Sequence, residues 1–221
     1  LVGADALVRL DGRWTVVMEY VPGATVHEVL KAERQLPASV ALTVVEEVAD
    51  ALETMWSTEA TSGRPLHLLH RDLKPNNLQL TDQGDVKVLD FGLAQADFDQ
   101  REAESRRVVY GSPPYLSPER LEAHDTPAGD VFALGATLAE MVTGRRPEPV
   151  SARPQPHAKR IQVLLDAVDE VLQDPSVTDF TARMLAYEPE DRPTMVEVRD
   201  AMKALRKRHR EPEIRDWAKV V

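Results

Sequence analysis

Residues 70–77 read HRDLKPNN, and residues 90–92 read DFG. Two short apolar runs lie between these stretches, at 78–80 and 86–89, and the turn at 82–84 separates them. This pattern predicts a strand, a turn and a second strand. Such a unit returns the chain to its starting point, so the end of the first stretch should lie beside the start of the second. We therefore expect Asp72, Lys74, Asn77 and Asp90 to share one site.

These four side chains have the properties that phosphoryl transfer requires, which are positioning and charge neutralisation. Asp72 can accept or orient the proton of a substrate hydroxyl, and Lys74 can neutralise a transferring phosphoryl group from the same face. Asn77 and Asp90 offer hard oxygen ligands that suit Mg²⁺. A lone aspartate in a loop is usually a turn or cap residue, and isolated ones are interpreted in that way here: Asp82, Asp125 and Asp174. For Asp72 that interpretation would need the neighbouring motif residues to align by chance.

The order of these motifs resembles that of the eukaryotic-type protein kinases, including their bacterial members. Residues 70–77 match every fixed position of the family's catalytic loop, H-R-D-L-K-P-x-N. Residues 117–119 (SPE) stand where the family has A-P-E, and residues 130–135 (DVFALG) resemble the start of its buried helix. Arg192 matches the arginine that pairs with the A-P-E glutamate. The resemblance covers about residues 5–205, and five motifs in order make it specific.

The resemblance implies an α+β, protein-kinase-like fold with a mostly α-helical C-lobe and a partial β N-lobe. It also implies ATP-dependent phosphorylation of serine or threonine hydroxyls in a protein substrate. Asp72 and Lys74 would be catalytic, while Asn77 and Asp90 would bind the cofactors, ATP and Mg²⁺, as the metal ligands. Lys74 and the step from Gly111 to Ser112 resemble the serine/threonine branch, in which Ser112 would hydrogen-bond near Asp72 and Lys74. His70 would be a packing residue.

Residues 18–21 (MEYV) resemble the family's hinge. The Glu19 carbonyl and the Val21 N–H and C=O would bind the adenine ring, and the Met18 side chain would close the back of that pocket. The alternative is simply a buried strand. The distance to the catalytic loop, filled by a short and a long helix, favours the hinge.

Hydrophobic periodicity predicts the remaining elements. We expect a hairpin of strands at 7–10 and 14–20, and helices at 25–31, 39–55, 131–142, 161–172, 177–185 and from 194 onward. Residues 93–126 lack periodicity and should form a long functional loop. Residues 1–20 would be a remnant of the N-lobe (its fourth and fifth strands), residues 21–205 the C-lobe, and residues 206–221 a polar tail or linker.

Three features of the kinase family are missing from these 221 residues. No two of the ten glycines are closer than six positions, which excludes G-x-G-x-x-G, and the first lysine, Lys31, follows the hinge. The helix glutamate that pairs with the family's strand lysine also has no place before Met18. We expect the chain to begin near the fourth N-lobe strand and, by itself, to bind ATP weakly and to transfer phosphate poorly. The parent protein would be an active kinase.

Composition limits the classes of partner and compartment. The net charge of −10 disfavours non-specific nucleic-acid binding, and the absence of cysteine excludes disulfides and thiolate metal sites. The sequence has no apolar run of the length that a membrane span needs. We expect a cytoplasmic location, or the cytoplasmic part of a larger, membrane-anchored kinase. Composition does not predict an oligomeric state.

Two local features leave alternatives open. Gln79 stands where the family has an apolar residue under the adenine, and a buried amide is costly unless it is hydrogen-bonded. The Gln79 amide would either hydrogen-bond the nucleotide or cause the nucleotide to be poorly placed. Arg71 needs an anionic partner, for which Ser105 is a candidate phosphosite and Glu102 and Glu104 are fixed acids. A solvated run of charges explains that loop equally well.

Two other functions compete with the kinase. A non-catalytic kinase-like binding module, a pseudokinase or scaffold, is favoured by the missing strand lysine, whereas the intact set of Asp72, Lys74, Asn77 and Asp90 opposes it. A small-molecule phosphotransferase would share the same acid and amide groups. The long loop that ends in GSPPY and SPE argues against it, because it resembles a platform for protein substrates.

Overall fold

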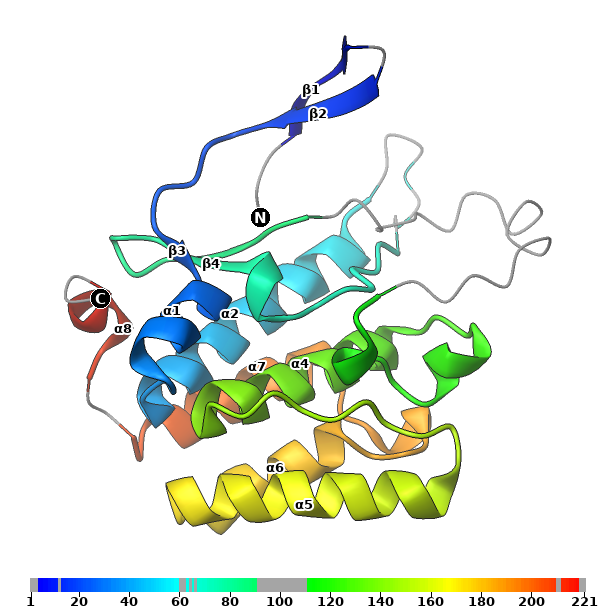
Figure 1. Ribbon diagram of the computed structural model, residues 1–221, viewed down its shortest axis with the longest axis vertical. Coiled ribbons are helices and arrows are strands. Elements are labelled where there is room, and N and C mark those ends of the chain that lie inside the picture. The colour runs from blue at the N-terminus through cyan, green and yellow to red at the C-terminus, as the bar shows by residue number, and fades with distance from the viewer. Residues whose placement is uncertain are drawn as a thin grey trace.

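The computed structural model describes residues 4–11, 13–59, 63, 65, 67–90, 111–209 and 212–218. Figure 1 shows a body of packed helices, a small sheet along its upper side and a hairpin that projects beyond the sheet. This is the α+β arrangement with a mostly helical lobe that the sequence predicted. The predictions for Phe91, Gly92, Glu102, Glu104 and Ser105 lie outside the described residues.

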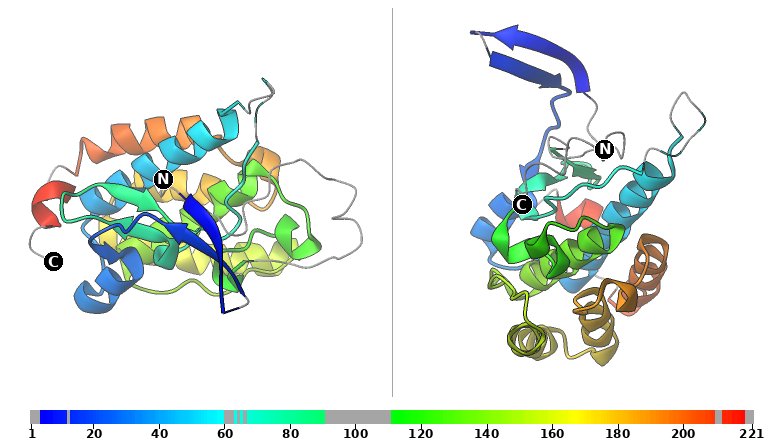
Figure 2. Two further views of the ribbon diagram at one scale, coloured as in Figure 1. Left: turned by 90° about the horizontal axis from the view of Figure 1, so that it is seen from above. Right: turned by 90° about the vertical axis from the view of Figure 1, so that its right-hand side faces the viewer.

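The projecting hairpin consists of β1 (Ala4–Leu10) and β2 (Arg13–Met18). The strands are antiparallel, with position 7 opposite position 16 and position 10 opposite position 13. The predicted hairpin is therefore confirmed, with Asp11 in the turn at a φ of 47°. Figures 1 and 2 show that the hairpin stands away from the helical body and is joined to it by an extended segment.

The second sheet has the order β3–β4–β5 and is antiparallel throughout. It contains β3 (Ala24–Thr25), β4 (Leu78–Leu80) and β5 (Val86–Val88). The strand–turn–strand unit predicted from 78–80 and 86–89 is thus confirmed. The sequence did not predict β3, because two residues are too few to show a period-two pattern.

Two amphipathic helices follow β3. The short α1 (Val26–Glu33) begins at a capping box, in which the Glu28 N–H donates to Thr25 Oγ1 at 3.2 Å and the Thr25 N–H donates to Glu28 Oε2 at 2.8 Å. The long α2 (Ala38–Ser57) buries the apolar face that the sequence predicted, including Val40, Val44 and Val48. The helix α7 (Met195–Arg206) packs against α2, and it begins at a capping box of Thr194 and Glu197.

The central helix is α4 (Pro127–Thr143), which is buried on nearly every face. Its N-cap is Thr126, whose Oγ1 accepts the Gly129 N–H at 3.2 Å. It ends at Gly144, which has a φ of 66° and lies so close to Arg34 that a Cβ would be 2.2 Å from the Arg34 carbonyl oxygen. Only glycine fits this position, because it tolerates positive φ and has no Cβ.

Two further helices, α5 (Pro154–Leu172) and α6 (Pro175–Met184), cover the lower side of α4 in Figure 1. The prediction that the first of these helices starts at 161 was wrong. Residues 154–160 are mostly polar and contain two prolines, so this stretch shows no apolar periodicity that would predict the start of the helix. Proline is tolerated there because the first turn of a helix has no internal partners for its N–H groups. Asp174 is a helix cap, as expected, and accepts the Ser176 N–H at 3.0 Å.

The segment expected to be a polar tail contains α8 (Ile214–Trp217). Ile214 is buried against the core and Trp217 is packed on it. Ser39, at the start of α2, donates a hydrogen bond to the Pro212 carbonyl at 2.7 Å. The described part of this segment therefore lies on the helical body rather than in solvent. No described helix is both long enough and apolar enough to span a bilayer.

Candidate active site

The loop at 70–77 is anchored to the central helix through a buried carboxylate. Asp130, in the first turn of α4, accepts the His70 N–H at 2.8 Å and the Arg71 N–H at 2.9 Å. Burial raises the pKa of Asp130, while His70 and the two backbone donors act in the opposite direction. His70 is fully buried, with Nε2 2.9 Å from the Leu89 carbonyl and Nδ1 3.3 Å from the Asp72 N–H. It is placed as a packing residue, as the resemblance implied.

Asp72 lies at the centre of a compact polar network. Its Oδ2 accepts from Lys74 Nζ at 2.5 Å, and its Oδ1 accepts the Ser112 N–H at 3.0 Å. Lys74 Nζ also donates to Ser112 Oγ at 2.9 Å. The predicted hydrogen bonding of Ser112 near Asp72 and Lys74 is therefore confirmed. The carboxylate and the ammonium are held in one orientation before any substrate arrives.

Gly111 allows the approach of Ser112 to this network. Its φ is 114°, and a Cβ there would lie 3.0 Å from the Arg71 carbonyl and 2.8 Å from a methyl of Leu116. A side chain at this position would push the segment away from Asp72. After Ser112 the chain forms the short helix η3 (Pro113–Tyr115).

Asn77 ends the short helix η1 (Pro75–Asn77) and is 6% exposed. Its Nδ2 donates to the Asp72 carbonyl at 2.7 Å, which leaves the amide oxygen to face a cation. The Leu89 N–H donates to the Asn77 carbonyl at 2.8 Å, so Asp90 is held next to Asn77 through the strand pairing. Asp90 is exposed and has a φ of 56°. The oxygen donors of Asn77 and Asp90 fit Mg²⁺, which takes few protein ligands and completes its shell with phosphates and water.

The predicted hinge residues lie apart from this network. Met18, at the end of β2, is 49% exposed, and Glu19 is exposed as well. Gln79 is 8% exposed, and its Nε2 donates to the Val21 carbonyl at 3.3 Å. The buried amide of Gln79 is thus satisfied by a backbone group that was expected to face the adenine. The roles of Met18, Glu19 and Val21 in adenine binding stay predictions.

One acidic residue beside the loop at 70–77 was not predicted from the sequence. Asp125, interpreted as a turn or cap residue, bridges two arginines instead, with its Oδ2 3.0 Å from Arg71 Nε and its Oδ1 2.9 Å from Arg120 Nε. Arg120 also donates to the Arg71 carbonyl. The sequence gives no local signal for this cluster, because Asp125 and Arg71 are far apart in the chain and the pairing depends on the tertiary fold.

The clamp formed by Asp125 and Arg120 holds Arg71 in a conformation that is unusual for its residue type. Arg71 has a φ of 71°, in the left-handed region that costs about 1–3 kcal/mol for non-glycine residues. Such strain persists only where the surroundings over-determine the backbone. Since Arg71 precedes Asp72, we infer that the clamp sets the direction in which the Asp72 carboxylate points.

We expect Asp125→Asn to lower kcat by between about 10-fold and 100-fold, because small displacements of a catalytic group have effects of that size. The KM for ATP should change little, since Asp125 acts on the catalytic loop through Arg71 and Arg120. Steady-state kinetics of phosphate transfer would measure both parameters. Asp125→Glu should restore part of kcat, and Glu122→Gln, on the exposed side of η4 (Glu119–Glu122), is the matched control. An equal loss in the control, or no change in kcat for Asp125→Asn, would contradict the positioning role.

A second ion pair fastens η4 to the C-terminal half. Arg192 Nη1 and Nη2 bind Glu119 Oε1 and Oε2 at 2.7 and 2.8 Å, and the Arg192 side chain is fully buried. Burial by itself would raise the pKa of Glu119, but the hydrogen bonds and charge of Arg192 outweigh it and hold that pKa below its ordinary value. The pairing predicted for Arg192 is confirmed. This pair holds the segment that leads away from Ser112 and η3.

Comparison with known proteins agrees with this geometry. The family described as "Protein kinase domain" matches residues 4–204. The chain is 38% identical over 133 residues to "Serine/threonine-protein kinases drp72" of Corynebacterium efficiens, which covers 60% of this chain and 24% of that protein. It is 32% identical over 223 residues to "Tyrosine-protein kinase MasK" of Myxococcus xanthus, which covers 95% of this chain and 33% of that protein.

A third relative is "Serine/threonine-protein kinase PknB" of Mycobacterium leprae, which is 35% identical over 168 residues, or 69% of this chain and 26% of that protein. The chain spans between 24% and 33% of the length of these three relatives. The family match covers nearly all of the sequence, and the catalytic-loop network lies within it. The chain therefore belongs to the protein kinase domain family, in its eukaryotic-like form found in bacteria.

Proposed function

We propose that the protein transfers the γ-phosphoryl group of ATP to serine or threonine hydroxyls of a protein substrate. The observation that carries this proposal is the network in which Asp72 is bonded to Lys74, Asn77 and Ser112. In the proposal, Asp72 serves as the proton acceptor, Lys74 as the cation and Asn77 as a metal ligand around one point. Phosphoryl transfer depends on this arrangement more than on covalent chemistry.

In the proposed reaction, the Asp72 carboxylate orients the substrate hydroxyl and takes its proton. The hydroxyl oxygen forms a bond to the γ-phosphorus, and the bond from that phosphorus to the ADP oxygen breaks. Lys74 neutralises charge on the transferring group from beside Asp72. Asn77 and Asp90 would hold Mg²⁺, which supplies charge neutralisation at the phosphates. We place the reaction in the cytoplasm, where ATP is available.

The choice of acceptor is supported by Lys74 and Ser112. Among the relatives are proteins named serine/threonine kinases and one named a tyrosine kinase, so similarity alone does not decide the acceptor. A serine hydroxyl lies much closer to its own backbone than a tyrosine hydroxyl does. The lysine that bridges Asp72 and Ser112 fills space beside the carboxylate, which favours a short acceptor side chain over a phenol ring.

These 221 residues lack the sequence features that cover and hold the nucleotide phosphates in the kinase family. The sequence contains no G-x-G-x-x-G and no lysine before Lys31, and the Val21 carbonyl already accepts from Gln79. These features support weak ATP binding by the 221-residue chain alone. They also favour the second candidate, a non-catalytic kinase-like module. The complete set of Asp72, Lys74, Asn77 and Asp90 favours catalysis, because a binding module has no use for it.

A phosphotransfer assay tests the proposal. The full gene product and the 221-residue chain would each be incubated with γ-labelled ATP, Mg²⁺ and three peptides that differ only in a serine, threonine or tyrosine acceptor. We expect the full gene product to label serine and threonine and not tyrosine, with one ADP formed per phosphate transferred. The 221-residue chain should be slower by about 10²-fold or more, the cost of losing electrostatic stabilisation of the phosphates. If the full gene product labels no peptide and not itself, the binding-module function replaces this one.

A further inference from the structure

The short helix α8 lies against the sheet that leads to the predicted metal ligands. Figures 1 and 2 show α8 at one end of this sheet, beside the turn that joins β4 to β5. Gly84 lies in that turn, and a Cβ on it would be 2.6 Å from Arg215 Cα and 2.9 Å from the Arg215 backbone nitrogen. The backbone of α8 therefore rests directly on the turn, at a distance that only glycine allows.

Contacts with the helical body hold this segment in place. The Ser39 hydroxyl, at the start of α2, donates to the Pro212 carbonyl at 2.7 Å. Ile214 is 8% exposed and belongs to the core, and α8 lies against α2. Backbone that is both bonded and buried in this way resists local opening. The helix α8 is thus fixed to α2 on one side and rests on the sheet on the other.

Trp217, the last residue of α8, lies beside the segment that enters β3. It is partly buried and packs on the core. It lines a cavity of about 260 Å³, whose other walls include Gly23, Ala24, Val29 and Leu80. This volume is below the range of about 300–1,000 Å³ that small-molecule sites occupy. We therefore interpret the cavity as a narrow packing gap, across which Trp217 lies next to residues 23 and 24.

The segment beside Trp217 joins the projecting hairpin to the helical body (Figure 1). Val21, whose N–H and C=O are predicted to bind adenine, precedes Gly23 by two residues, and its carbonyl accepts from Gln79 Nε2 at 3.3 Å. The Gly23 backbone lies directly on β4, since a Cβ there would be 2.0 Å from the Leu80 carbonyl oxygen. The segment is therefore bounded by β4 and by Trp217.

We propose that Trp217 is a positioning residue for the adenine of ATP. It acts through Gly23 and Ala24, whose placement sets the direction of the N–H and C=O of Val21. None of the four residues assigned to phosphoryl transfer and metal binding lines the cavity beside Trp217, so the effect is on nucleotide affinity and not on the transfer step. This inference rests on the proposed kinase function and on the predicted role of Val21. It gives the segment at 212–218, which was expected to be a polar tail or linker, a part in ATP binding.

Nucleotide kinetics of the full gene product test this role. Trp217→Ala should raise the KM for ATP by about three- to tenfold, the size of one displaced backbone hydrogen bond. The kcat at saturating ATP should stay near that of the wild type, because the catalytic loop is not altered. Trp217→Phe should keep most of the affinity, since it retains a large aromatic ring. An unchanged KM in Trp217→Ala would overturn the proposal.

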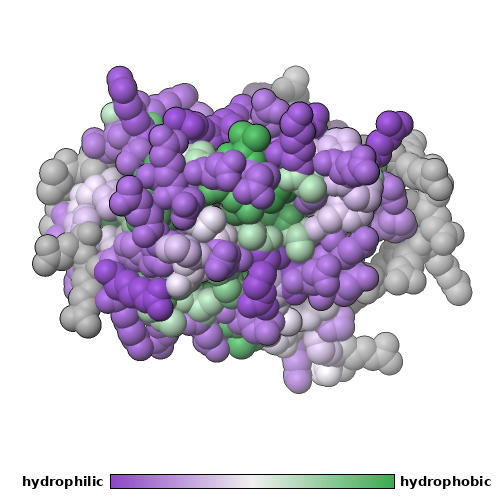
Figure 3. Space-filling view, turned by 90° about the horizontal axis from the view of Figure 1, so that it is seen from below, coloured by the Kyte–Doolittle hydropathy of each residue, from purple (hydrophilic) through white to green (hydrophobic). Residues whose placement is uncertain are grey.

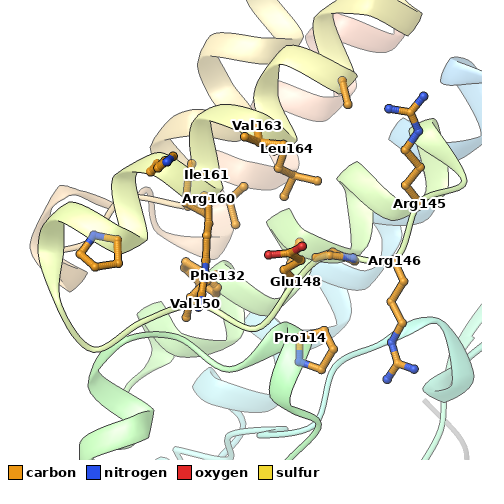
Figure 4. Close-up of a pocket in the computed structure, with 16 residues that line it drawn as sticks. Pro114, Phe132, Arg145, Arg146, Glu148, Val150, Arg160, Ile161, Val163 and Leu164 are labelled. Atoms are coloured by element: carbon orange, nitrogen blue, oxygen red, sulfur yellow. The ribbon is translucent and has the colours of Figure 1, made fainter.

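The matched control removes an apolar side chain far from the sheet. Val163, on α5, is 65% exposed and lies at the cavity between α4 and α5 that Figure 4 shows. Figure 3 views the face that carries α5, where apolar side chains gather among hydrophilic ones. Val163→Ala should therefore leave the KM for ATP unchanged. A rise equal to that of Trp217→Ala would contradict a specific role for Trp217.

Two inhibitors separate adenine positioning from general loosening of the fold. Adenosine has the base and ribose without phosphates, and inorganic tripolyphosphate has the phosphates without the base. In Trp217→Ala the inhibition constant of adenosine should rise by the same factor as the KM for ATP. That of tripolyphosphate with Mg²⁺ should not change, because Asn77 and Asp90 hold the metal in the proposed function. An equal rise for both inhibitors would show structural damage and would overturn the proposal.

A second variant displaces α8 without changing Trp217. Gly84→Ala places a methyl group against the α8 backbone and should raise the KM for ATP to a similar degree. Gly63→Ala is the matched control, because Gly63 has a similar φ, 74° against 81°, but a Cβ there meets no atom within 4 Å. Adding Trp217→Ala to Gly84→Ala should raise the KM little further, since both changes act through the position of α8. Fully additive effects would contradict this account.

Equilibrium dialysis with labelled ATP separates failure of positioning from failure of catalysis, because it reports a dissociation constant even if no phosphate is transferred. Weaker ATP binding by Trp217→Ala, without phosphorylation of any peptide by any form, would refute the kinase function alone. Phosphorylation with the same ATP dissociation constant in the wild type and Trp217→Ala would refute positioning alone. A wild type that binds no ATP would overturn both.

Discussion

Asp72→Asn in the full gene product is expected to lower kcat for peptide phosphorylation by between about 10² and 10⁴-fold, the usual contribution of a positioned proton acceptor. The amide that replaces the carboxylate cannot take the hydroxyl proton. It also places either an N–H group or a weaker acceptor against Lys74 Nζ, which now lies 2.5 Å from Asp72 Oδ2. Both effects act on the transition state, so kcat should fall far more than any KM changes.

Three measurements separate this chemical effect from damage to the fold. The ATP dissociation constant should stay near that of the wild type, because Asn77 and Asp90 hold the metal in the proposal and Asp72 does not. The urea midpoint should change little, since an amide oxygen can still accept the Ser112 N–H that Asp72 Oδ1 accepts now. Asp82→Asn, at an exposed turn, is the matched control and should leave kcat unchanged. Full turnover by Asp72→Asn would show that another group takes the proton.

The centre of the site could be predicted because three of its four predicted site residues lie within the eight contiguous residues 70–77. Asp72, Lys74 and Asn77 lie in one loop, and the strand–turn–strand unit that follows has a clear pattern, so their meeting needed no long-range information. Ser112 followed from the resemblance alone. The helices with regular apolar faces were predictable for the same reason, since burial of one face imposes a period of 3.6 residues.

The missed features depend on contacts between distant segments. Asp125 has the sequence context of an ordinary loop acid, and only the tertiary fold places it between Arg71 and Arg120. Gln79 left two outcomes open because its partner, the Val21 carbonyl, comes from the distant segment between β2 and β3. The docking of α8 on α2 likewise rests on a few residues, chiefly Ile214, in a polar stretch whose composition predicts a linker.

Arg192 contributes strongly to the stability of the fold. Its side chain is fully buried, and each of its three nitrogens is bonded: Nε to the Ala186 carbonyl, Nη1 to Glu119 and the Ala128 carbonyl, and Nη2 to Glu119 and the Tyr187 carbonyl. Its guanidinium also lies over the Phe132 ring, 5.1 Å from the centroid. One residue thus joins η4, the start of α4 and the segment after α6.

We expect Arg192→Ala to lower the free energy of unfolding by about 3–5 kcal/mol. The variant removes the cationic partner of the Glu119 carboxylate and the side-chain donor to three backbone carbonyls, and loss of buried hydrogen bonds costs free energy. Urea unfolding would measure the change. Arg192→Lys should recover only part of it, because a lysine cannot reproduce the bidentate geometry and the other bonds of the guanidinium. Arg199→Ala, which removes ion pairs to the exposed Asp50 and Asp200, is the control and should have a far smaller effect.

The pH dependence of the free energy of unfolding separates the contribution of the Glu119–Arg192 ion pair from that of side-chain packing. The pKa of Glu119 is lowered in the folded protein, so the pair stabilises the fold fully above the ordinary glutamate pKa of about 4.3. As the pH falls below that value and through the lowered pKa, the folded protein must take up a proton and the stabilisation is lost. The stability difference between the wild type and Glu119→Gln should therefore shrink on acidification below about pH 4. A difference that stays constant across this range would show that Arg192 acts through packing and its backbone bonds, and that the charge of Glu119 contributes little to holding η4 beside the catalytic loop.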